Sequence, residues 1–357
     1  MTVDQNTLKT TYLRSNWKKT VIIVSTLLVI VLLFFVSIYV NGRDISFFNC
    51  IDIVISHLAG ETYEYNTDRW WDDYILWKLS VPRAILAIIA GAGLAVGGAA
   101  MQGVMKNPLA DPYTTGISSA TVLGVAIAMV MGYSVTGPGQ YGVVLNAFVF
   151  GLIPVVGMLA VSKVLDSSPA SLILFGVIIS AMFGAISTLV MVMADDMTLQ
   201  SVYAWQVGSL YDSHWGDLPL PLTITAVCTV SIMFTSGKMN LLLLGDDSAH
   251  SLGLNVENYR IILLALVSLM TASIVCFTGI LGFVGLVVPH MVRMIFGSDN
   301  RFLIPLSAVF GSFALIAADI VSRTVIYPNE LQVGVVLAFL GAPLFLYVIV
   351  RNKRTVW

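Results

Sequence analysis

The sequence predicts an all-α, polytopic membrane protein with about ten transmembrane helices, forming a single domain over residues 1–357. Three observations support this fold class. Hydrophobic residues make up 57% of the chain and charged residues only 11%, whereas soluble domains carry about 25% charged residues. Mean hydropathy is +0.89, and uncharged runs of about 20 residues, long enough to cross a bilayer as helices, recur along the chain. The basic residues are also shared unequally between the two sides that such helices define.

The first four spans are predicted from residues 21–162. The run 21–40 follows two lysines but is longer than the about 7–15 residues of a signal-peptide core and lacks a small-residue cleavage site, so we expect a retained helix. The second span, 84–105, is rich in glycine, which favours close helix packing in lipid. Residues 112–162 carry no charge and are too long for one helix, and "TGPGQ" at 136–140 divides them into the third and fourth spans.

The remaining six spans follow from the same pattern. The fifth covers 170–194 and the sixth 218–237. Residues 261–292 again exceed one crossing, and glycines at 279, 282 and 285 indicate a turn between a seventh and an eighth span. The ninth covers 302–325 and the tenth 331–350. Without the split of 261–292, the alternative total is nine.

The distribution of basic residues predicts the orientation. With a cytoplasmic N-terminus and ten spans, 13 of the 18 basic residues lie inside: Lys9, Arg14, Lys18, Lys19, Lys106, Lys163, Lys238, Arg260, Arg293, Arg301, Arg351, Lys353 and Arg354. Five lie outside: Arg43, Arg69, Lys78, Arg83 and Arg323. Because basic residues are enriched in cytoplasmic loops, both termini are predicted to be cytoplasmic. Nine spans would instead place the "RNKR" tail outside.

The segments between the spans differ in character. Residues 1–20 form a cytoplasmic N-terminal segment, and 41–79 a long external loop with Trp70, Trp71 and Trp77, which suit an interfacial aromatic belt. Residues 195–217 predict a short amphipathic helix on the outer surface, and the inner loop 238–260 predicts two short helices joined at a glycine.

The stretch "NPLADPYTTGISS" at 107–119 begins with a tight cytoplasmic turn. Pro108 and Pro112 cannot continue a helix from within, and Asp111 can cap the next one.

Motifs for catalysis and metal binding are not found. The chain lacks a G-x-x-x-x-G-K-[ST] phosphate-binding loop, and Cys50, Cys228 and Cys276 are too scattered for a disulfide framework or a metal site. The four histidines, His57, His214, His250 and His290, fall in different segments, and we interpret His290 as structural rather than as a ligand or proton relay. Asp319 and Arg323 are four residues apart and are predicted to form an ion pair near the outer end of the ninth span, with a proton site as the alternative. The net charge of -2 argues against nucleic acid as a partner.

Four blocks of sequence carry a resemblance to a known family. They are "VPRAILAIIAGAGLAVGGAAMQGVMKNPLADPYTTGISSA" (81–120), "LLLLGDDSAHSLGL" (241–254), "GILGFVGLVVPHMVRMIFGSDNRFLIPLSAVFGSFALIAADIVSR" (279–323) and "NELQVGVVLAFLGAPLFLYVIV" (329–350). In order and spacing they resemble the permease subunits of the iron–siderophore, haem and vitamin B12 family of ABC importers, from about residue 80 to the end.

The resemblance implies a type II ABC importer permease fold with ten helices per subunit, in a homodimer or close heterodimer with the translocation path between the subunits. It implies two ATP-binding cassette ATPase subunits inside and an extracytoplasmic substrate-binding protein outside. The chain itself would then be no enzyme and would need no cofactor. The expected cargo is a bulky metal chelate crossing the plasma membrane, a ferric siderophore first and haem or cobalamin next. The alternatives are an ion-coupled secondary transporter or channel, which needs a coupling carboxylate at midplane, and a membrane-embedded enzyme, which needs a convergent polar cluster.

The resemblance also implies three sets of site residues. The segment expected to contact the ATPase contains Gly245, Asp246, Asp247, Ser248, Ala249, His250, Leu252 and Gly253, with Ala249 small enough to approach a groove and Leu252 as an apolar anchor. The expected cytoplasmic gate contains Asn107, Pro108 and Leu109, and at the start of the fifth helix Pro169, Ala170 and Ser171. The expected docking residues for the binding protein are Lys78, Arg83 and Arg323.

Three positions depart from the family pattern. Ser80 stands where a basic residue is often found, and Gln332 where proline is common. The start of the fifth helix lacks the expected pair of hydroxyl residues.

Overall fold

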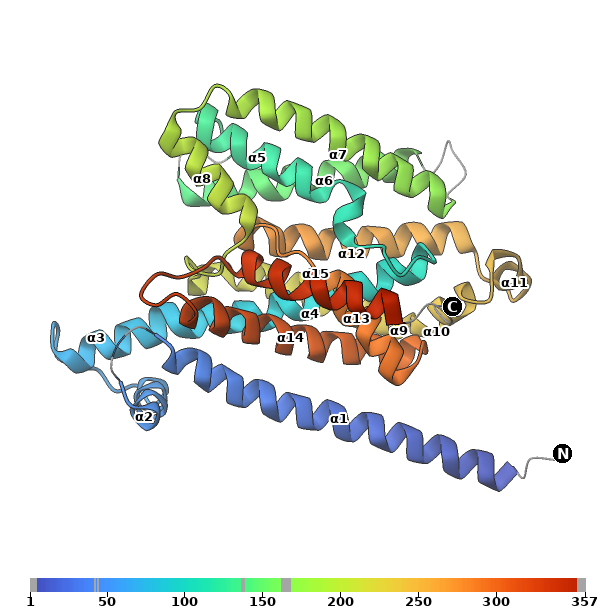
Figure 1. Cartoon of the computed structure of the whole chain (residues 1–357), viewed down its shortest axis with the longest axis horizontal. Coiled ribbons are helices and arrows are strands. Elements are labelled where there is room, and N and C mark those ends of the chain that lie inside the picture. The colour runs from blue at the N-terminus through green and yellow to red at the C-terminus, as the bar shows by residue number, and fades with distance from the viewer. Residues whose placement is uncertain (1–4, 42, 44, 136–138, 162–167, 352–357) are drawn as a thin grey trace.

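The computed structural model describes residues 5–41, 43, 45–135, 139–161 and 168–351, and within these ranges the regular elements are all helices (Figure 1). Ten of them coincide with the predicted spans: α1 (Gln5–Tyr39), α4 (Val81–Val104), α5 (Ile117–Met131), α6 (Gln140–Val161), α7 (Pro169–Met191), α9 (Pro219–Phe234), α12 (Val256–Thr278), α13 (Val284–Phe296), α14 (Asn300–Thr324) and α15 (Val333–Arg351). In the described part of the chain, seven helices are long and apolar enough to cross a membrane, whereas α5, α13 and α15 are shorter apolar helices. The all-helical, multi-pass architecture is therefore confirmed, and the count of ten crossings stays a prediction.

Both predicted splits of the long apolar runs are confirmed. α5 ends at Met131 and α6 begins at Gln140. α12 ends at Thr278 and α13 begins at Val284, and Gly279 and Phe283 between them both take a φ of +68°. A left-handed residue ends the run of helical hydrogen bonds, so the chain turns here and α13 is a separate helix.

The helix α4 is the centre of the bundle. Its residues are buried along almost their whole length, and α9, α12, α13 and α14 surround it. A Cβ added to Gly98 would overlap the carbonyl oxygen of Gly285 in α13, and one added to Gly91 would overlap that of Gly311 in α14. Glycine lets helix backbones approach closely in lipid, and this is the packing role that the glycine-rich second span predicted.

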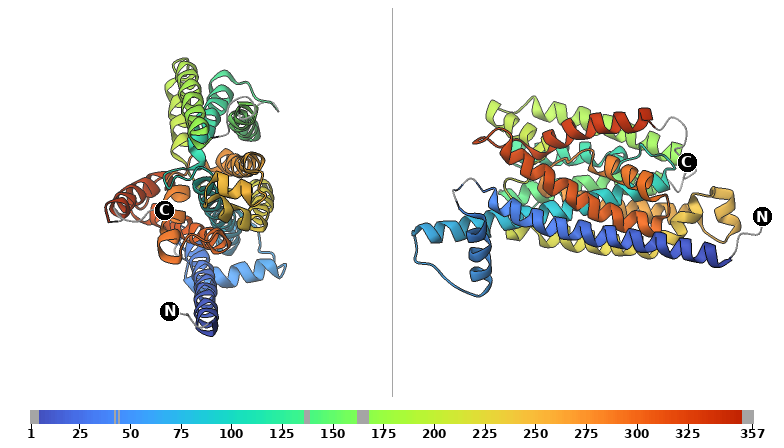
Figure 2. Two further views of the ribbon diagram at one scale, coloured as in Figure 1. Left: turned by 90° about the vertical axis from the view of Figure 1, so that its right-hand side faces the viewer. Right: turned by 60° about the horizontal axis from the view of Figure 1, so that its bottom comes forward.

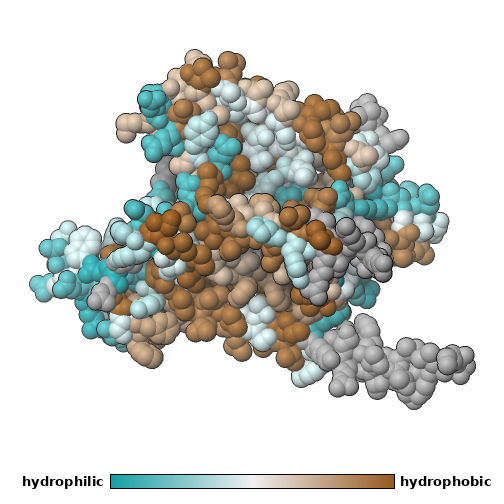
Figure 3. Space-filling view, viewed as in Figure 1, coloured by the Kyte–Doolittle hydropathy of each residue, from teal (hydrophilic) through white to brown (hydrophobic). Residues whose placement is uncertain are grey.

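A second layer contains α5, α6, α7 and the short helix α8 (Asp196–Val207), stacked beside the layer of α12 and α4 (Figures 1 and 2). A helix is present within the predicted segment 195–217 as α8, followed by the short turn η3 (Trp215–Asp217). The apolar residues of α8 are not gathered on one face, so the expected amphipathic character is wrong. Large apolar side chains remain exposed on α7 and α15, among them Leu174, Ile178, Leu189, Phe339 and Leu346. In Figure 3 a hydrophobic band runs over α14 and α15, and hydrophilic residues gather at the two ends of the bundle.

The two ends of the bundle carry different short helices. One end holds α2 (Phe47–Leu58), α3 (Asp68–Ile75) and the π-helix η1 (Leu76–Ser80), and the other holds α10 (Ser236–Leu242) and α11 (Asp246–Ser251), near the N-terminal end of α1 (Figure 1). We call these ends outer and inner, following the predicted orientation. The two short helices predicted for the inner loop 238–260 are therefore present, and they meet at Gly245, which takes a φ of +105°.

The predicted external loop 41–79 is mostly helical instead. Its helices enclose a small apolar core that includes Ile38, Cys50, Ile53 and Leu76, and this burial stabilises helices too short to form alone. α3, η1 and α4 form one continuous helical segment, Asp68–Val104, so the helix that contains the second span begins well before the predicted residue 84.

Candidate functional site

A buried cluster of charged side chains lies at the outer end. The Asp319 carboxylate of α14 accepts hydrogen bonds from Nε of Arg83 at 2.9 Å and from Nη2 of Arg323 at 2.7 Å, and it has no exposed surface. Arg83 also pairs with Glu330, its Nη1 lying 2.7 Å from Oε2. The predicted Asp319–Arg323 ion pair is confirmed, and it belongs to a network that joins α4, α14 and the segment before α15.

Arg323 also caps the C-terminal end of α1. Its Nη1 donates to the carbonyl oxygens of Ser37 and Val40, and its Nη2 donates to the Ser37 hydroxyl at 2.6 Å. The last four carbonyls of a helix lack intrahelical donors, and a cation beside them is favourable. The guanidinium group presents five donors in one plane, so a single side chain can cap α1 and hold Asp319 together.

The three predicted docking residues lie in different surroundings. Arg83 and Arg323 are each only 6% exposed, and their donors are used within the chain. Lys78 in η1 is exposed. Of the three side chains, Lys78 is therefore the most accessible to an approaching protein. Docking at these residues stays a prediction, and the exposure of their side chains favours Lys78.

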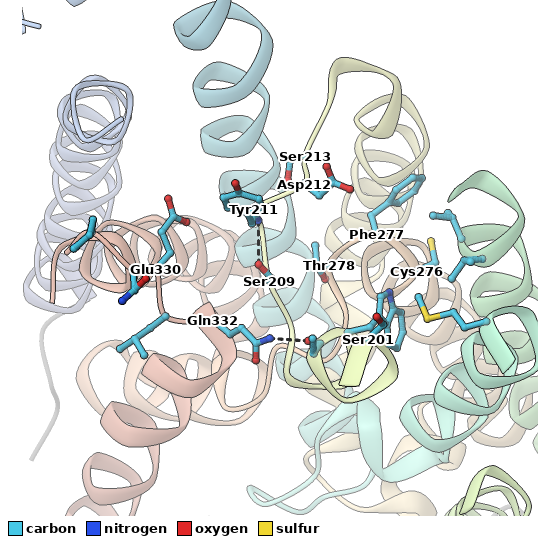
Figure 4. A pocket seen from close by; sticks show the side chains of 18 residues that line it. Ser201, Ser209, Tyr211, Asp212, Ser213, Cys276, Phe277, Thr278, Glu330 and Gln332 are labelled. Atoms are coloured by element: carbon cyan, nitrogen blue, oxygen red, sulfur yellow. Dashed lines mark hydrogen bonds between the residues drawn. The ribbon is translucent and has the colours of Figure 1, made fainter. Parts of the chain in front are cut away.

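A cavity of about 1010 Å³ lies beside the ionic cluster at the outer end. α5, α6, α8, the C-terminal end of α12 and the segments 209–213 and 328–332 form its wall. Trp205 contributes an aromatic ring. Phe277 contributes a second ring, and Tyr211, Asp212 and Glu330 contribute polar groups (Figure 4). Because Glu330 lines the cavity and also pairs with Arg83, the ionic cluster is part of this wall. Pockets for drug-sized ligands measure about 300–1,000 Å³, so the cavity is large enough to hold such a molecule.

At the inner end, the turn after α4 contains the first set of predicted gate residues. The Asn107 N–H donates to the Gln102 carbonyl at 3.2 Å, and Lys106 between them takes a φ of +48°. This is the Schellman arrangement, in which glycine is usual because a residue with a Cβ is disfavoured there. Asn107 Oδ1 then accepts from the Leu109 N–H at 2.9 Å, which tightens the turn and leaves Leu109 51% exposed.

Asp111 has the predicted capping role. Its carboxylate accepts from the Tyr113 N–H at 2.8 Å, at the start of the short helix η2 (Pro112–Thr115) and not of α5 itself.

The second set of predicted gate residues begins α7. Pro169 is the first residue of the helix, and Ser168 before it accepts from the Ser171 N–H at 3.2 Å. The Ser168 and Ser171 hydroxyl oxygens lie 2.9 Å apart, so a hydroxyl pair does stand at this helix start, flanking Pro169 and Ala170. α7 also packs against η2, where a Cβ at Gly176 would overlap the Thr114 carbonyl. α7, which begins with the second gate segment, thus packs against η2, the short helix that follows the first gate segment in the chain, and gating stays a prediction.

The short helix α11 forms the tip of the inner end. Gly245 precedes it, Gly253 follows it with a φ of +85°, and Asp246 and Asp247 lie in its first turn, where carboxylates are favourable. Its outward face carries Asp247, Ser248, His250 and Leu252, all exposed, and Leu252 is 60% exposed as an apolar anchor requires.

The expectation for Ala249 is wrong. Ala249 has no exposed surface and packs into the main hydrophobic core, because it lies on the face of α11 that contacts α10 and α12. It therefore cannot approach a groove in another protein. Leu244, 62% exposed between α10 and α11, offers an apolar contact outside the predicted set of residues, within the resembling block 241–254.

Asp246 joins α11 to two other elements. Its Oδ1 accepts from Lys106 Nζ at 2.8 Å, and its two carboxylate oxygens lie 3.1 and 3.2 Å from Arg260 Nη2 in α12. Partial burial alone would raise the pKa of Asp246, but the hydrogen bonds from Lys106 and Arg260 outweigh it and hold that pKa below the usual value. The carboxylate is therefore charged at neutral pH, and it binds the lysine that precedes the inner turn.

Comparison with known proteins identifies the family. The FecCD transport family profile matches residues 27–351. The chain belongs to the FecCD transport family.

The sequence of this permease is similar to those of several transport permeases. It is 39% identical to an ABC transporter permease protein of Methanocaldococcus jannaschii, over 79% of this chain and 83% of that protein. It is 36% identical to the hemin transport system permease protein HmuU of Yersinia pestis, over 80% of this chain and 86% of that protein. It is 34% identical to the vitamin B12 import system permease protein BtuC of Vibrio cholerae, over 84% and 90%. A solved structure described as an inward-facing conformation of a metal-chelate type ABC transporter matches with a TM-score of 0.79 and 26% identity, over 92% of this permease and 99% of that chain.

Two features of the permease site were not predicted from its sequence. Arg83 joins the Asp319–Arg323 pair across 236 residues, and Lys106 reaches Asp246 across 140 residues. The one local signal was a lysine placed directly before a proline-containing turn, at a position where glycine is usual.

Proposed function

We propose that the chain is the membrane-spanning subunit of an ABC importer that carries a bulky metal chelate into the cell, using ATP hydrolysed by separate subunits. Membership of the FecCD family and the hemin and vitamin B12 permeases among its relatives support this function. The structural observation that carries it is the α10–α11 hairpin. It presents exposed Leu244 and Leu252 at a polar end of the molecule, a pattern that favours a protein contact over solvent.

A second permease subunit, identical or closely similar, is part of the proposal. α7 and α15 expose apolar side chains along their length, including Val177, Met182, Leu189, Phe339 and Leu340. Lipid can cover such faces, but a helix of a second subunit can cover them equally and enclose a path between the two chains. We infer that these two helices meet a partner permease.

The outer end would receive the cargo from an extracytoplasmic binding protein. The cavity beside Glu330 has aromatic and polar groups in its wall, which suits a chelate with both apolar and hydrogen-bonding surface. A ferric siderophore is the first candidate cargo, and haem and cobalamin are the next. Lys78, the exposed member of the predicted docking set, would meet a carboxylate of the binding protein.

The surroundings of Asp319 do not favour an ion-coupled mechanism. Such a transporter needs a buried carboxylate that can release its charge, and Asp319, the predicted candidate, is held by two arginines at 2.9 and 2.7 Å. We therefore keep the ATP-driven importer as the single proposed function.

The test is reconstitution of the permease with its ATPase and binding protein in proteoliposomes that contain ATP. Uptake is measured for a ferric siderophore, haem and cobalamin, each with ATP and with a non-hydrolysable analogue. The proposal expects uptake of one chelate class, dependent on hydrolysis. Uptake driven by an ion gradient without the ATPase would overturn it.

The α11 contact is tested with Leu252→Asp. A carboxylate cannot enter an apolar contact without desolvation, so co-purification of the ATPase should be lost while the permease still folds. Leu58→Asp is the matched control, because Leu58 is 69% exposed and lies at the opposite end in α2. If Leu252→Asp retains the ATPase as well as wild type does, α11 is not the contact.

A further inference from the structure

The ion pair between Lys106 and Asp246 joins two parts of the chain that the proposed function gives different tasks. Asp246 is the first residue of α11, which we propose to contact the ATPase. Lys106 immediately precedes Asn107, Pro108 and Leu109, the predicted inner gate. Lys106 Nζ and Asp246 Oδ1 lie 2.8 Å apart, and Asp246 also accepts hydrogen bonds from Arg260 in α12.

The backbone at Lys106 is part of the same arrangement. A φ of +48° is disfavoured for a residue with a Cβ, and glycine or asparagine is usual at this position of a Schellman turn. Glycine would form the turn with less strain but could not reach Asp246. A lysine there has the side chain needed to bridge from the end of α4 to α11.

From Lys106 the contacts continue into the bundle. The Asn107 N–H binds the Gln102 carbonyl at 3.2 Å, and Gln102 Nε2 donates to the Leu286 carbonyl of α13 at 3.1 Å. Gln102 is completely buried, so its amide is fixed between α4 and α13. A displacement of α11 can therefore reach the turn and α13 through hydrogen bonds and one ion pair, with no flexible segment between them.

The other side of Asp246 is rigid. The Arg260 side chain is 3% exposed, and Tyr259 beside it donates its hydroxyl to the Thr235 carbonyl at 2.7 Å, before α10. α11 is thus anchored to α12 on one side, and on the other side Lys106, with a side chain 30% exposed, links it to the end of α4.

We propose that Lys106 is a coupling residue: its ion pair with Asp246 transmits movement of the ATPase-contacting helix α11 to the inner gate turn after α4. The proposal rests on the proposed function of α11. It predicts that breaking the ion pair leaves folding, ATPase association and ATP hydrolysis intact but separates hydrolysis from transport.

The experiment uses the complete transporter in proteoliposomes and measures molecules transported per ATP hydrolysed. Lys106→Gly removes the ammonium while fitting the left-handed backbone, so it should assemble and hydrolyse ATP as wild type does. Transport per ATP should fall about fivefold or more, the low end of usual coupling between sites. Lys106→Arg restores a cation and should recover most of the ratio.

Arg301→Gln is the matched control. Arg301 is an exposed cation at the same inner end, at the start of α14, and its removal lowers the surface charge equally. It should leave transport per ATP unchanged. A double-mutant cycle with Asp246→Asn completes the set. Asp246→Asn also loses the pairing with Arg260, so adding Lys106→Gly to it should lower transport per ATP no further than Asp246→Asn alone does.

The outcomes separate this inference from the function on which it rests. If the wild-type permease does not bind the ATPase, the proposed function fails. If wild type transports and Lys106→Gly transports with an unchanged ratio, the function stands and the coupling role of Lys106 is wrong. Equal losses in Lys106→Gly and Lys106→Arg would also overturn it, since they would show that the turn and not the cation matters.

Discussion

Replacing Arg323 by methionine should destabilise the permease itself. Methionine has similar length but no charge or donors, so the change removes the pairing with Asp319 and the cap on α1. We expect the C-terminal end of α1 to separate from α14, because the Ser37 and Val40 carbonyls and the Ser37 hydroxyl all bind this one guanidinium.

The magnitude follows from the burial of the pair. Removing one partner of a buried ion pair costs about 3–5 kcal/mol, and the lower end applies here because Asp319 keeps Arg83 at 2.9 Å. The carbonyls that lose their donors add about 1 kcal/mol. The expected loss in the free energy of unfolding is therefore about 4 kcal/mol. At about 2 °C per kcal/mol for a large domain, Tm should fall by about 8 °C.

The assay is thermal unfolding of the purified permease in detergent, with hydrogen exchange of the α1 amides as a local readout. Lys78→Met is the control, since Lys78 is exposed at the same end and a surface change costs within about 0.5 kcal/mol. Arg323→Met should also speed exchange in the last turn of α1 and leave α12 unchanged. An unaltered Tm with weakened docking of the binding protein would refute this reasoning, because it would assign Arg323 to the partner and not to the fold.

Two further predictions concern topology and pH. The three native cysteines are buried, so they should give little background labelling by an impermeant maleimide. The reagent should label Tyr65→Cys, at a site 77% exposed, on intact cells, and should label Ser248→Cys only after permeabilisation. The reverse pattern would overturn the orientation. Burial disfavours the charged form of Asp246, but Lys106 and Arg260 outweigh it, so its pKa in the folded protein is below the unfolded value of about 3.9. Such a group stabilises the protein above that unfolded value, and the contribution is lost as the pH falls through the folded pKa. Transport per ATP in proteoliposomes should therefore stay level from about pH 8 to about pH 5, and a decline that begins near neutral pH would contradict the assigned ion pair.

The spans could be predicted because lipid imposes a strong local rule. A helix in a bilayer must be apolar over its whole length, so each span is visible as an uncharged run, and the breaks near 136–140 and 279–283 are visible as glycine and proline. The same local logic predicted the Asp319–Arg323 pair, since residues four apart share a helix face. Rules of this kind depend only on neighbours in the sequence.

The unpredicted features depend on tertiary packing. Arg83 and Glu330 join Asp319 from α4 and from the segment before α15, and no sequence pattern records that contact. Ala249 was assigned to the wrong face because α11 has six residues, too few to show which side has the apolar period. The sequence does not reveal α2 because, although apolar, its 12 residues are too few to cross a bilayer, and it does not reveal α3 because four of its eight residues are charged.

The unbroken helical segment Asp68–Val104 mechanically connects the outer end of the molecule to the inner end. At 1.5 Å per residue its 37 residues extend about 55 Å, whereas the hydrocarbon core of a bilayer is about 30 Å thick. In the predicted orientation the outer part of the segment extends beyond the hydrocarbon core, where the proposed binding protein would meet α3. Its other end is the turn at Lys106. A tilt of the outer end of this segment would therefore displace the turn at Lys106. The exception is a bend at the π-helical stretch Leu76–Ser80, where the hydrogen-bond register shifts by one residue.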